Sequence, residues 1–131
     1  MSNGLVLLVD DDSDLIKMYS ERLKLAGYDV VVARDGQQGY EAAKSVKPGL
    51  ILLDIMMPKV NGLDALKMMR AEPALAKVPI IMLTALIQET NREKGLLAGA
   101  NGYLVKSKVV PRDLVAMAKK YLAKPDYATT A

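Results

Sequence analysis

The sequence contains no cysteine and no histidine. The lack of cysteine excludes disulfide bonds, and the lack of both residues removes thiol nucleophiles and the zinc sites that these side chains build. Without histidine the chain can carry neither a Ser-His-Asp triad nor a phosphorylated imidazole of its own. Any chemistry must therefore rest on carboxylates, lysines, tyrosines and hydroxyl groups.

Long apolar runs are also missing. No run approaches the roughly 20 residues that a membrane-spanning helix needs, and the opening Met-Ser-Asn-Gly lacks the positive charge of a signal peptide. We therefore expect a soluble, cytoplasmic protein that does not contact the membrane. A length of 131 residues, with 51% hydrophobic and 25% charged residues, predicts one globular domain.

Charge is unevenly distributed along the chain. Lysine and arginine outnumber aspartate and glutamate by 18 to 15, which gives a net charge of +3. Four carboxylates crowd into residues 10–14, whereas eight basic residues follow from Arg92 onward. We expect the basic part to be a solvated face with no direct nucleic-acid binding, because neither a helix-turn-helix pattern nor an arginine-rich run is present.

Short apolar runs alternate with helical patterns. The runs cover residues 5–9, 30–33, 50–53, 80–83 and 103–105. Such runs are typical of strands buried on both faces of a parallel sheet. The helical patterns that follow them cover residues 15–26, 37–45, 63–70, 88–98 and 111–123. This order of strand then helix predicts an α/β fold, with a parallel five-stranded sheet and helices on both faces.

Capping residues mark some of the helix ends. Ser13 is a possible N-cap of the first helix, and Gly27 suits its C-terminal cap. Pro111 fits the first turn of the last helix. The three Asn-Gly pairs, at residues 3, 61 and 101, are interpreted as turns.

Polar residues stand at the ends of four predicted strands. Asp10 and Asp11 follow the first strand, and the ends of the third, fourth and fifth carry Asp54, Thr84 and Lys106. Ligands of open α/β sheets bind beyond the carboxyl ends of the strands, so we expect these side chains to share one crevice. Three carboxylates in one crevice repel each other unless a cation lies among them.

The available ligand atoms predict the cation and its chemistry. The candidate ligands are oxygen atoms, and the chain has no histidine nitrogen or cysteine sulfur to offer. We therefore predict that the metal is Mg²⁺. A carboxylate beside Mg²⁺ can act as a nucleophile toward a phosphoryl group. Thr84 could donate a hydrogen bond to one phosphoryl oxygen, and Lys106 could neutralise another.

Four short motifs together resemble the receiver domain of two-component response regulators. They are Val9-Asp10-Asp11, Leu53-Asp54-Ile55-Met56-Met57-Pro58, Leu83-Thr84-Ala85 and Gly102-Tyr103-Leu104-Val105-Lys106. The resemblance covers about residues 4–123 and implies a chemotaxis-receiver-like, flavodoxin-like (βα)5 doubly wound sheet with strand order 2-1-3-4-5. We expect a single receiver domain over residues 1–123 and a short polar tail over residues 124–131.

The resemblance implies a role for each residue of the acidic cluster. Asp54 would be the phosphoacceptor in a phosphorelay or two-component system. Asp11, Asp54 and the backbone carbonyl of Met56 would ligate Mg²⁺, while Asp10 would act mainly through a bound water. Asp12 and Asp14 have no role in the family and are interpreted as carboxylates that favour the start of a helix.

Further implied roles concern the phosphoryl group and the signal. Thr84 and Lys106 would bind the phosphoryl group, and Thr84 with Tyr103 would switch a protein-binding surface on helix 4, strand 5 and helix 5. The family usually has proline after this lysine. Here Ser107 follows, and because a cis bond before a non-proline residue costs about 3 kcal/mol, we predict a trans Lys106–Ser107 bond.

The implied partners are proteins. A sensor histidine kinase or a histidine phosphotransfer protein would donate the phosphoryl group, and an unknown protein would receive the signal. The receiver would be a monomer or a weak, phosphorylation-dependent homodimer. It would catalyse its own phosphorylation and dephosphorylation without being an enzyme in the usual sense.

Two other interpretations remain open at this point. A haloacid-dehalogenase-type phosphohydrolase also carries an Asp-x-Asp motif, here Asp10 and Asp12, but it would leave Asp54 without a role and needs acidic metal ligands after Lys106. Only two acidic residues follow Lys106, in the predicted last helix and in the tail. A receiver-shaped adaptor that is never phosphorylated is the third interpretation, although the full set of phosphorylation residues is present.

Overall fold

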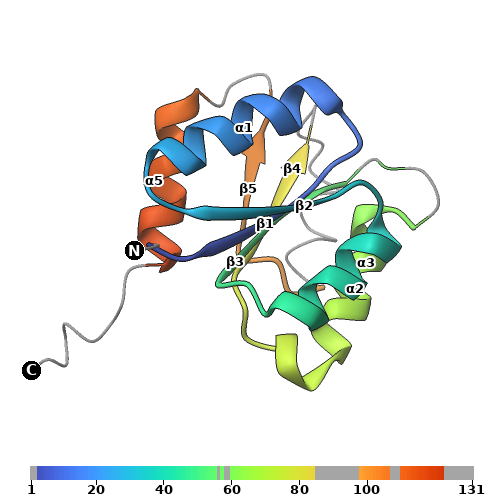
Figure 1. The fold of residues 1–131 in the computed structure, drawn as a ribbon. Helices are drawn as coiled ribbons and strands as arrows, with labels where there is room; N and C mark the ends of the chain where they lie inside the picture. The colour runs from blue at the N-terminus through green and yellow to red at the C-terminus, as the bar shows by residue number, and fades with distance from the viewer. Residues whose placement is uncertain (1–2, 56, 58–59, 85–97, 107–109, 123–131) are drawn as a thin grey trace, which may run out of the picture.

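Five parallel strands form the centre of the molecule. The computed structural model describes residues 3–55, 57, 60–84, 98–106 and 110–122. The strands are β1 (Leu5–Val9), β2 (Asp29–Ala33), β3 (Leu50–Asp54), β4 (Ile80–Thr84) and β5 (Gly102–Val105). Their order across the sheet is β2-β1-β3-β4-β5, and every neighbouring pair is parallel (Figure 1). This order confirms the predicted doubly wound topology.

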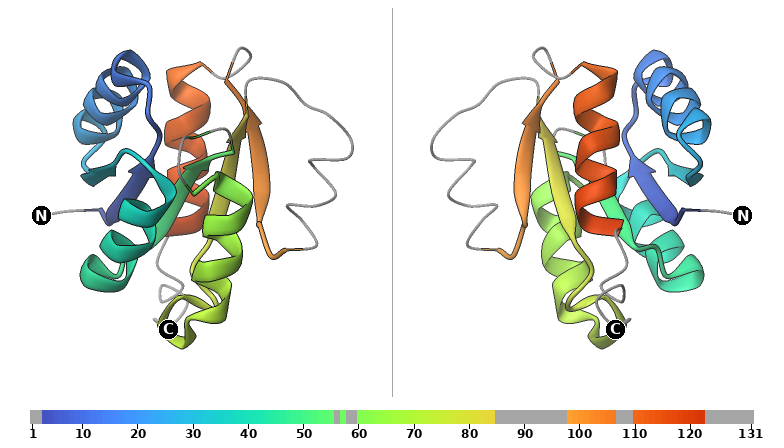
Figure 2. Two further views of the ribbon diagram at one scale, coloured as in Figure 1. Left: turned by 90° about the vertical axis from the view of Figure 1, so that its right-hand side faces the viewer. Right: turned by 90° about the vertical axis from the view of Figure 1, so that its left-hand side faces the viewer.

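Helices cover both faces of the sheet. On one face lie α1 (Ser13–Leu25) and α5 (Pro111–Leu122), and on the other α2 (Gly36–Val46) and α3 (Gly62–Ala71), followed by the short helix η1 (Pro73–Leu75) (Figures 1 and 2). The helix predicted over residues 88–98 lies outside the described residues except for Ala98, which is in a turn. Within the described ranges, no helix combines the length and the apolar character that a bilayer crossing requires.

The apolar runs of the sequence become the two halves of the core. Every residue of β3 and β4 is buried, since both strands have neighbours on either side. In β1, Leu7 and Val9 face the α2 and α3 layer, while Val6 and Leu8 face the α1 and α5 layer. The outer strands β2 and β5 are only partly buried, so the prediction of burial on both faces holds only for the inner strands.

The start of α1 corrects one prediction. Asp12, and not Ser13, is the N-cap, because its carboxylate accepts hydrogen bonds from the backbone N–H groups of Asp14 at 3.0 Å and Leu15 at 3.2 Å. A charged carboxylate is a stronger acceptor at a positive helix end than a hydroxyl. The Ser13 hydroxyl instead accepts a hydrogen bond from the Arg34 guanidinium at 2.9 Å. The C-terminal cap is confirmed, since the residue after the cap position, Gly27, has a φ of 94°.

Candidate functional site

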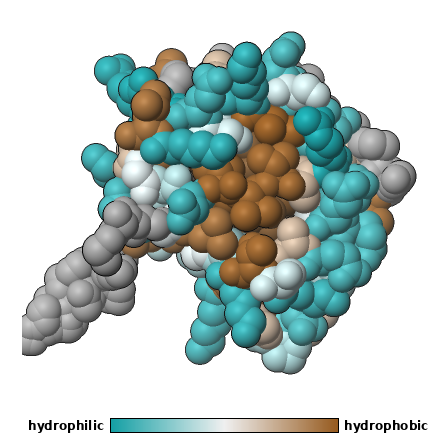
Figure 3. Space-filling view, in the orientation of Figure 1, coloured by the Kyte–Doolittle hydropathy of each residue, from teal (hydrophilic) through white to brown (hydrophobic). Residues whose placement is uncertain are grey.

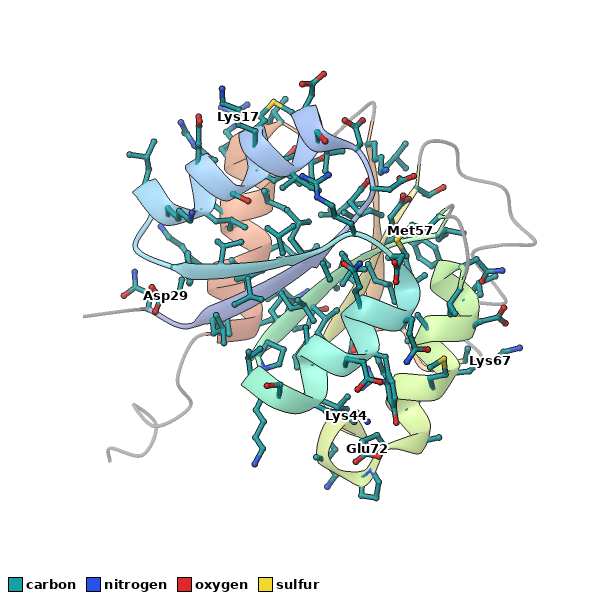
Figure 4. All side chains as sticks on the ribbon, turned by 45° about the vertical axis from the view of Figure 1, so that its right-hand side comes forward. Lys17, Asp29, Lys44, Met57, Lys67 and Glu72 are labelled. Carbon is teal, nitrogen blue, oxygen red and sulfur yellow. The ribbon has the colours of Figure 1, made fainter. Side chains whose placement is uncertain are left out.

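The carboxyl ends of the inner strands meet at one edge of the sheet. The parallel register places Val9 beside Leu53 and Asp54 beside Leu83, so the residues at the strand ends gather at the same level. Figure 4 shows Met57 at this end of the sheet, on the segment that continues from β3. The predicted crevice therefore lies where the sheet topology places it.

Three carboxylates converge in this crevice. One oxygen from each of Asp10, Asp11 and Asp54 lies within 4.8 Å of the others. Asp10 and Asp54 are buried, with 0% and 3% of their surface exposed, whereas Asp11 is exposed. Two buried carboxylates with a third at the solvent boundary form a cluster of oxygen ligands that a hydrated divalent cation can reach.

Lys106 joins two of these carboxylates. Its Nζ lies 2.8 Å from Asp10 Oδ2 and 3.1 Å from Asp54 Oδ1. Burial by itself lowers the pKa of Lys106, but the hydrogen bonds and negative charges of Asp10 and Asp54 outweigh burial and raise this pKa above 10.5. The lysine is therefore a permanent cation at neutral pH, and it offsets part of the repulsion between the aspartates.

The second oxygen of Asp10 is also held. The backbone N–H of Asp12 donates a hydrogen bond of 3.0 Å to Asp10 Oδ1. Because Asp12 also caps α1, the loop between β1 and α1 fixes the orientation of the Asp10 carboxylate. The Asp10 carboxylate is therefore held by a hydrogen bond at the start of α1 and by the ion pair with Lys106.

The neighbouring strands contribute Thr84 and Tyr103. Thr84 ends β4 and is buried, with 5% of its surface exposed, and its carbonyl accepts a hydrogen bond of 2.7 Å from the backbone N–H of Lys106. Tyr103 pairs with Met82 across the sheet and packs against the core beneath α2 and α3. Leu104 packs against the opposite layer, so Tyr103 faces away from α1 and α5.

Three predicted features lie outside the described residues. They are the carbonyl of Met56, the Lys106–Ser107 bond and the helix 4 part of the switch surface. These features stay predictions.

Gly62 is a site residue whose role the sequence did not reveal. A Cβ atom at this position would overlap the backbone carbonyl of Asp54. The Gly62 N–H donates a 2.9 Å hydrogen bond to the carbonyl of Ile55, and the Asn61 side chain caps α3 by accepting from the N–H of Asp64 at 3.0 Å. The Asn-Gly pair indicates a turn in the sequence, but it does not show that the turn returns to contact Asp54.

Comparison with known proteins identifies the family. The sequence matches the family described as response regulator receiver domain over residues 6–125. The chain belongs to this family. The identification confirms the predicted fold and a phosphoacceptor function in two-component signalling.

Curated relatives are longer than this receiver. It is 36% identical over 126 residues to the alkaline phosphatase synthesis transcriptional regulatory protein PhoP of Bacillus subtilis, and 38% identical over 121 residues to the DNA-binding response regulator MtrA of Mycobacterium tuberculosis. These alignments cover 96% and 92% of the receiver and 51% of each relative. The receiver thus spans about half the length of the curated relatives it matches.

Solved structures with the same fold include a chemotaxis protein and the receiver domain of a histidine kinase. Vibrio cholerae chemotaxis protein CheY4 has a TM-score of 0.85 and 31% identity, with 90% of this chain and 98% of that chain covered. The receiver domain of the Pseudomonas aeruginosa sensor histidine kinase PA1611 has a TM-score of 0.84 and 30% identity, with coverages of 92% and 98%. The latter was solved with a magnesium ion coordinated in its active site cleft.

Proposed function

We propose that the receiver accepts a phosphoryl group on the carboxylate of Asp54. The observation that carries this proposal is the position of Lys106, which contacts both Asp10 and Asp54. Asp54 ends β3, the middle strand of the sheet. An Asp54 oxygen would attack the phosphorus of a phosphohistidine donor. A P–O bond forms, the P–N bond breaks, and the imidazole leaves with the electron pair and takes up a proton.

Two neighbouring side chains would stabilise the transferred group. Lys106 provides a positive charge that is already placed 3.1 Å from Asp54, so little reorganisation is needed as negative charge develops on the phosphoryl oxygens. Thr84, at the end of the adjacent strand β4, would donate a hydrogen bond to another oxygen. Neither side chain is a nucleophile in this scheme.

The carboxylate cluster fits Mg²⁺. All three convergent side chains offer oxygen, the ligand that Mg²⁺ prefers, and one of them reaches solvent, which suits an ion that keeps several of its waters. Asp11 and Asp54, with the carbonyl of Met56, would hold the ion, and Asp10 would contact it through water. When bound, the ion neutralises charge on the attacking carboxylate and on the phosphoryl group.

Phosphorylation would change the surface near β5. If Thr84 turns toward the phosphoryl group, it vacates space that the Tyr103 ring can enter from its position over the α2 and α3 layer. The surface that changes would include helix 4, β5 and α5, with Val110, which is 43% exposed, at its border. An NMR comparison of the free and beryllofluoride-bound receiver checks this: we expect shifts that extend to Tyr103 and α5. Shifts confined to the surroundings of Asp54 would contradict the switch.

Receivers interact with histidine kinases or histidine phosphotransfer proteins, and we propose such a donor for this chain. We also propose a cytoplasmic location and a protein as the downstream target. Incubation with a radiolabelled phosphohistidine donor should move label from the donor to the receiver until one group per chain is bound. Steady turnover of a simple phosphate ester, such as p-nitrophenyl phosphate, would instead favour the phosphohydrolase alternative.

A further inference from the structure

A groove lies on the outer surface where α1 crosses α5. Both helices cover the same face of the sheet, and Figure 1 shows the end of α1 passing over α5. Leu23 of α1 and Leu114 and Ala118 of α5 are buried in the core on this face. Residues within 22–26 and 112–119 line the α1–α5 groove, whose volume is about 320 Å³.

Apolar side chains line part of this groove. They are Leu25 and Ala26 from the end of α1, and Val115 and Ala116 from α5. Leu25 is 82% exposed, more than any other large apolar side chain that the structure describes. Figure 3, in the orientation of Figure 1, shows hydrophobic patches within hydrophilic surface at this end of α1. A partner that covered these side chains would remove apolar surface from water.

Three cations line the same groove. Arg22 comes from α1, and Arg112 and Lys119 come from α5. All three are exposed, and within the described part of the chain none of their side chains forms an ion pair or a hydrogen bond. Lys44, by contrast, pairs with Glu41 on its own helix at 3.5 Å. The charge of the groove is therefore not neutralised by carboxylates of the described residues.

Arg112 occupies a position that does not favour a cation. It stands in the first turn of α5, where the helix dipole disfavours positive charge. The neighbouring carboxylate of Asp113 is engaged elsewhere, because it accepts a hydrogen bond from the backbone N–H of Val110 at 3.2 Å. The guanidinium of Arg112 thus adds nothing to the stability of α5, and it remains available to a ligand.

We propose that the α1–α5 groove binds an amphipathic helix of another protein, one that carries Asp and Glu residues beside its apolar face. The apolar face would cover Leu25 and Val115, as in other complexes in which a helix lies in a groove. The flanking carboxylates would pair with Arg22, Arg112 and Lys119, so charge complementarity selects an acidic partner. This proposal goes beyond the phosphoacceptor function and does not depend on it.

Other occupants fit the groove less well. A second copy that used the same groove would bring three cations against three cations, which repel. Nucleic acid would satisfy the cations but would leave the exposed side chain of Leu25 uncovered. The described lining also includes no aromatic ring on which a base could stack.

Synthetic peptides test the chemistry of the partner. The probe is a fluorescein-labelled helical peptide with leucine and alanine on one face and glutamate on both flanks. One control peptide has lysine in place of glutamate, and the other is a scrambled peptide of the same composition without an apolar face. By fluorescence anisotropy, the probe should bind the receiver about tenfold more tightly than either control. Equal binding of the scrambled peptide would overturn the helix, and equal binding of the lysine peptide would overturn the selection by charge.

Matched variants test the location. Arg112→Gln and Leu25→Ser should each weaken binding of the acidic probe about tenfold. Lys17→Gln on α1 and Lys120→Gln on α5 replace exposed cations outside the groove and should bind like the wild type. Circular dichroism checks that all four variants remain folded. Equal weakening in the controls and in Arg112→Gln would overturn the assignment to this groove.

Two further measurements test the other occupants. If a short DNA duplex bound more tightly than the acidic probe and Arg112→Gln abolished that binding, the groove would be a nucleic-acid site and the proposal would be wrong. Sedimentation of the receiver alone should show no self-association that Arg112→Gln alters. Self-association that this variant changed would assign the groove to a second copy and would also overturn the proposal.

Discussion

The ammonium of Lys106 lies 2.8 Å from Asp10 Oδ2, although β3 and β4 separate the strands that carry these residues. The contact joins the carboxyl ends of β1 and β5 across the crevice. Because Asp10 is fully buried, the lysine balances a carboxylate that has no access to bulk water.

The first prediction concerns removal of this cation. Lys106→Met should lower the free energy of unfolding in the absence of Mg²⁺ by about 3 kcal/mol, since two buried carboxylates lose the cation that balances their charge. The rise in melting temperature on addition of Mg²⁺ should be larger in the variant, because the metal then faces no competing cation. Thermal unfolding with and without Mg²⁺ measures both effects. Lys119→Met, at an exposed lysine of α5, is the control and should match the wild type.

The second prediction concerns alkaline pH. Burial raises the pKa of Tyr19 above its ordinary value. The positive charge of Lys106 lowers this pKa by a smaller amount, and the negative charge of Asp10 raises it further. Since the folded-state pKa lies above the ordinary value of 10.0, the stability from this group is complete below pH 10.0 and is lost as pH rises through the folded value. The pKa of Lys106 is also raised, so deprotonation of this lysine adds to the loss of stability above pH 10.5.

Urea unfolding across this pH range checks the sign. Tyr19→Phe should show a smaller loss of stability above pH 10.0 than the wild type, because the phenol no longer titrates. The pH dependence of the two proteins should be parallel below that value. A steeper alkaline loss in Tyr19→Phe would contradict the effect of burial on this tyrosine.

The third prediction concerns the close contact behind Asp54. Gly62→Ala should destabilise the receiver by about 2 kcal/mol, since its Cβ must displace the carbonyl of Asp54. Phosphorylation should also slow, because the acceptor side chain moves with its backbone. Gly102→Ala is the matched control: among the described residues, a Cβ there would meet only Ile81 Cδ1, at 3.4 Å. Denaturant unfolding that shows equal losses for both variants would argue against the contact.

The fourth prediction concerns Arg70, at the opposite end of the sheet from the acidic cluster. Its guanidinium donates hydrogen bonds to the carbonyls of Gly99 and Leu75, both at 2.9 Å, and to Asn101 Oδ1 at 2.8 Å. It thereby joins α3, the end of η1 and the turn before β5. Arg70→Met should lower the free energy of unfolding by about 2 kcal/mol, because these acceptors lose a charged donor.

The control for Arg70 lies on the same helix. Lys67, labelled in Figure 4, is exposed on α3, and Lys67→Met should leave stability unchanged. The loss of stability in Arg70→Met should be the same with and without Mg²⁺, since Arg70 is remote from the acidic cluster. If addition of Mg²⁺ restored the stability of this variant, Arg70 would not be independent of the cluster.

The sequence predicted the strands because their signal is local. Continuous apolar runs bounded by polar residues identify buried parallel strands, and the run at 50–53 became β3 with Asp54 as its last residue. The gathering of Asp10, Asp54 and Lys106 was predictable too, since parallel strands place their carboxyl ends at one edge. Their individual roles came from the family resemblance and not from spacing.

The remainder depended on contacts that local patterns do not encode. Ser13 and Asp12 are both good capping residues, and only the backbone geometry shows that the Asp12 carboxylate reaches the N–H groups of α1. Arg70 donates hydrogen bonds to Gly99 and Asn101, which lie 29 and 31 residues further along the chain. The sequence around Arg70 gives no sign of these distant acceptors. Gly62 shows its role only once the turn is seen against Asp54.

The most direct test of the account measures the mass of the intact receiver after incubation with acetyl phosphate and Mg²⁺. The wild type should gain one phosphoryl group, and chelation of the metal should prevent the gain. Asp54→Asn should gain none, whereas Asp14→Asn, which changes an exposed carboxylate in the first turn of α1, should be labelled like the wild type. Undiminished labelling of Asp54→Asn would contradict the assignment of Asp54 as the phosphoacceptor.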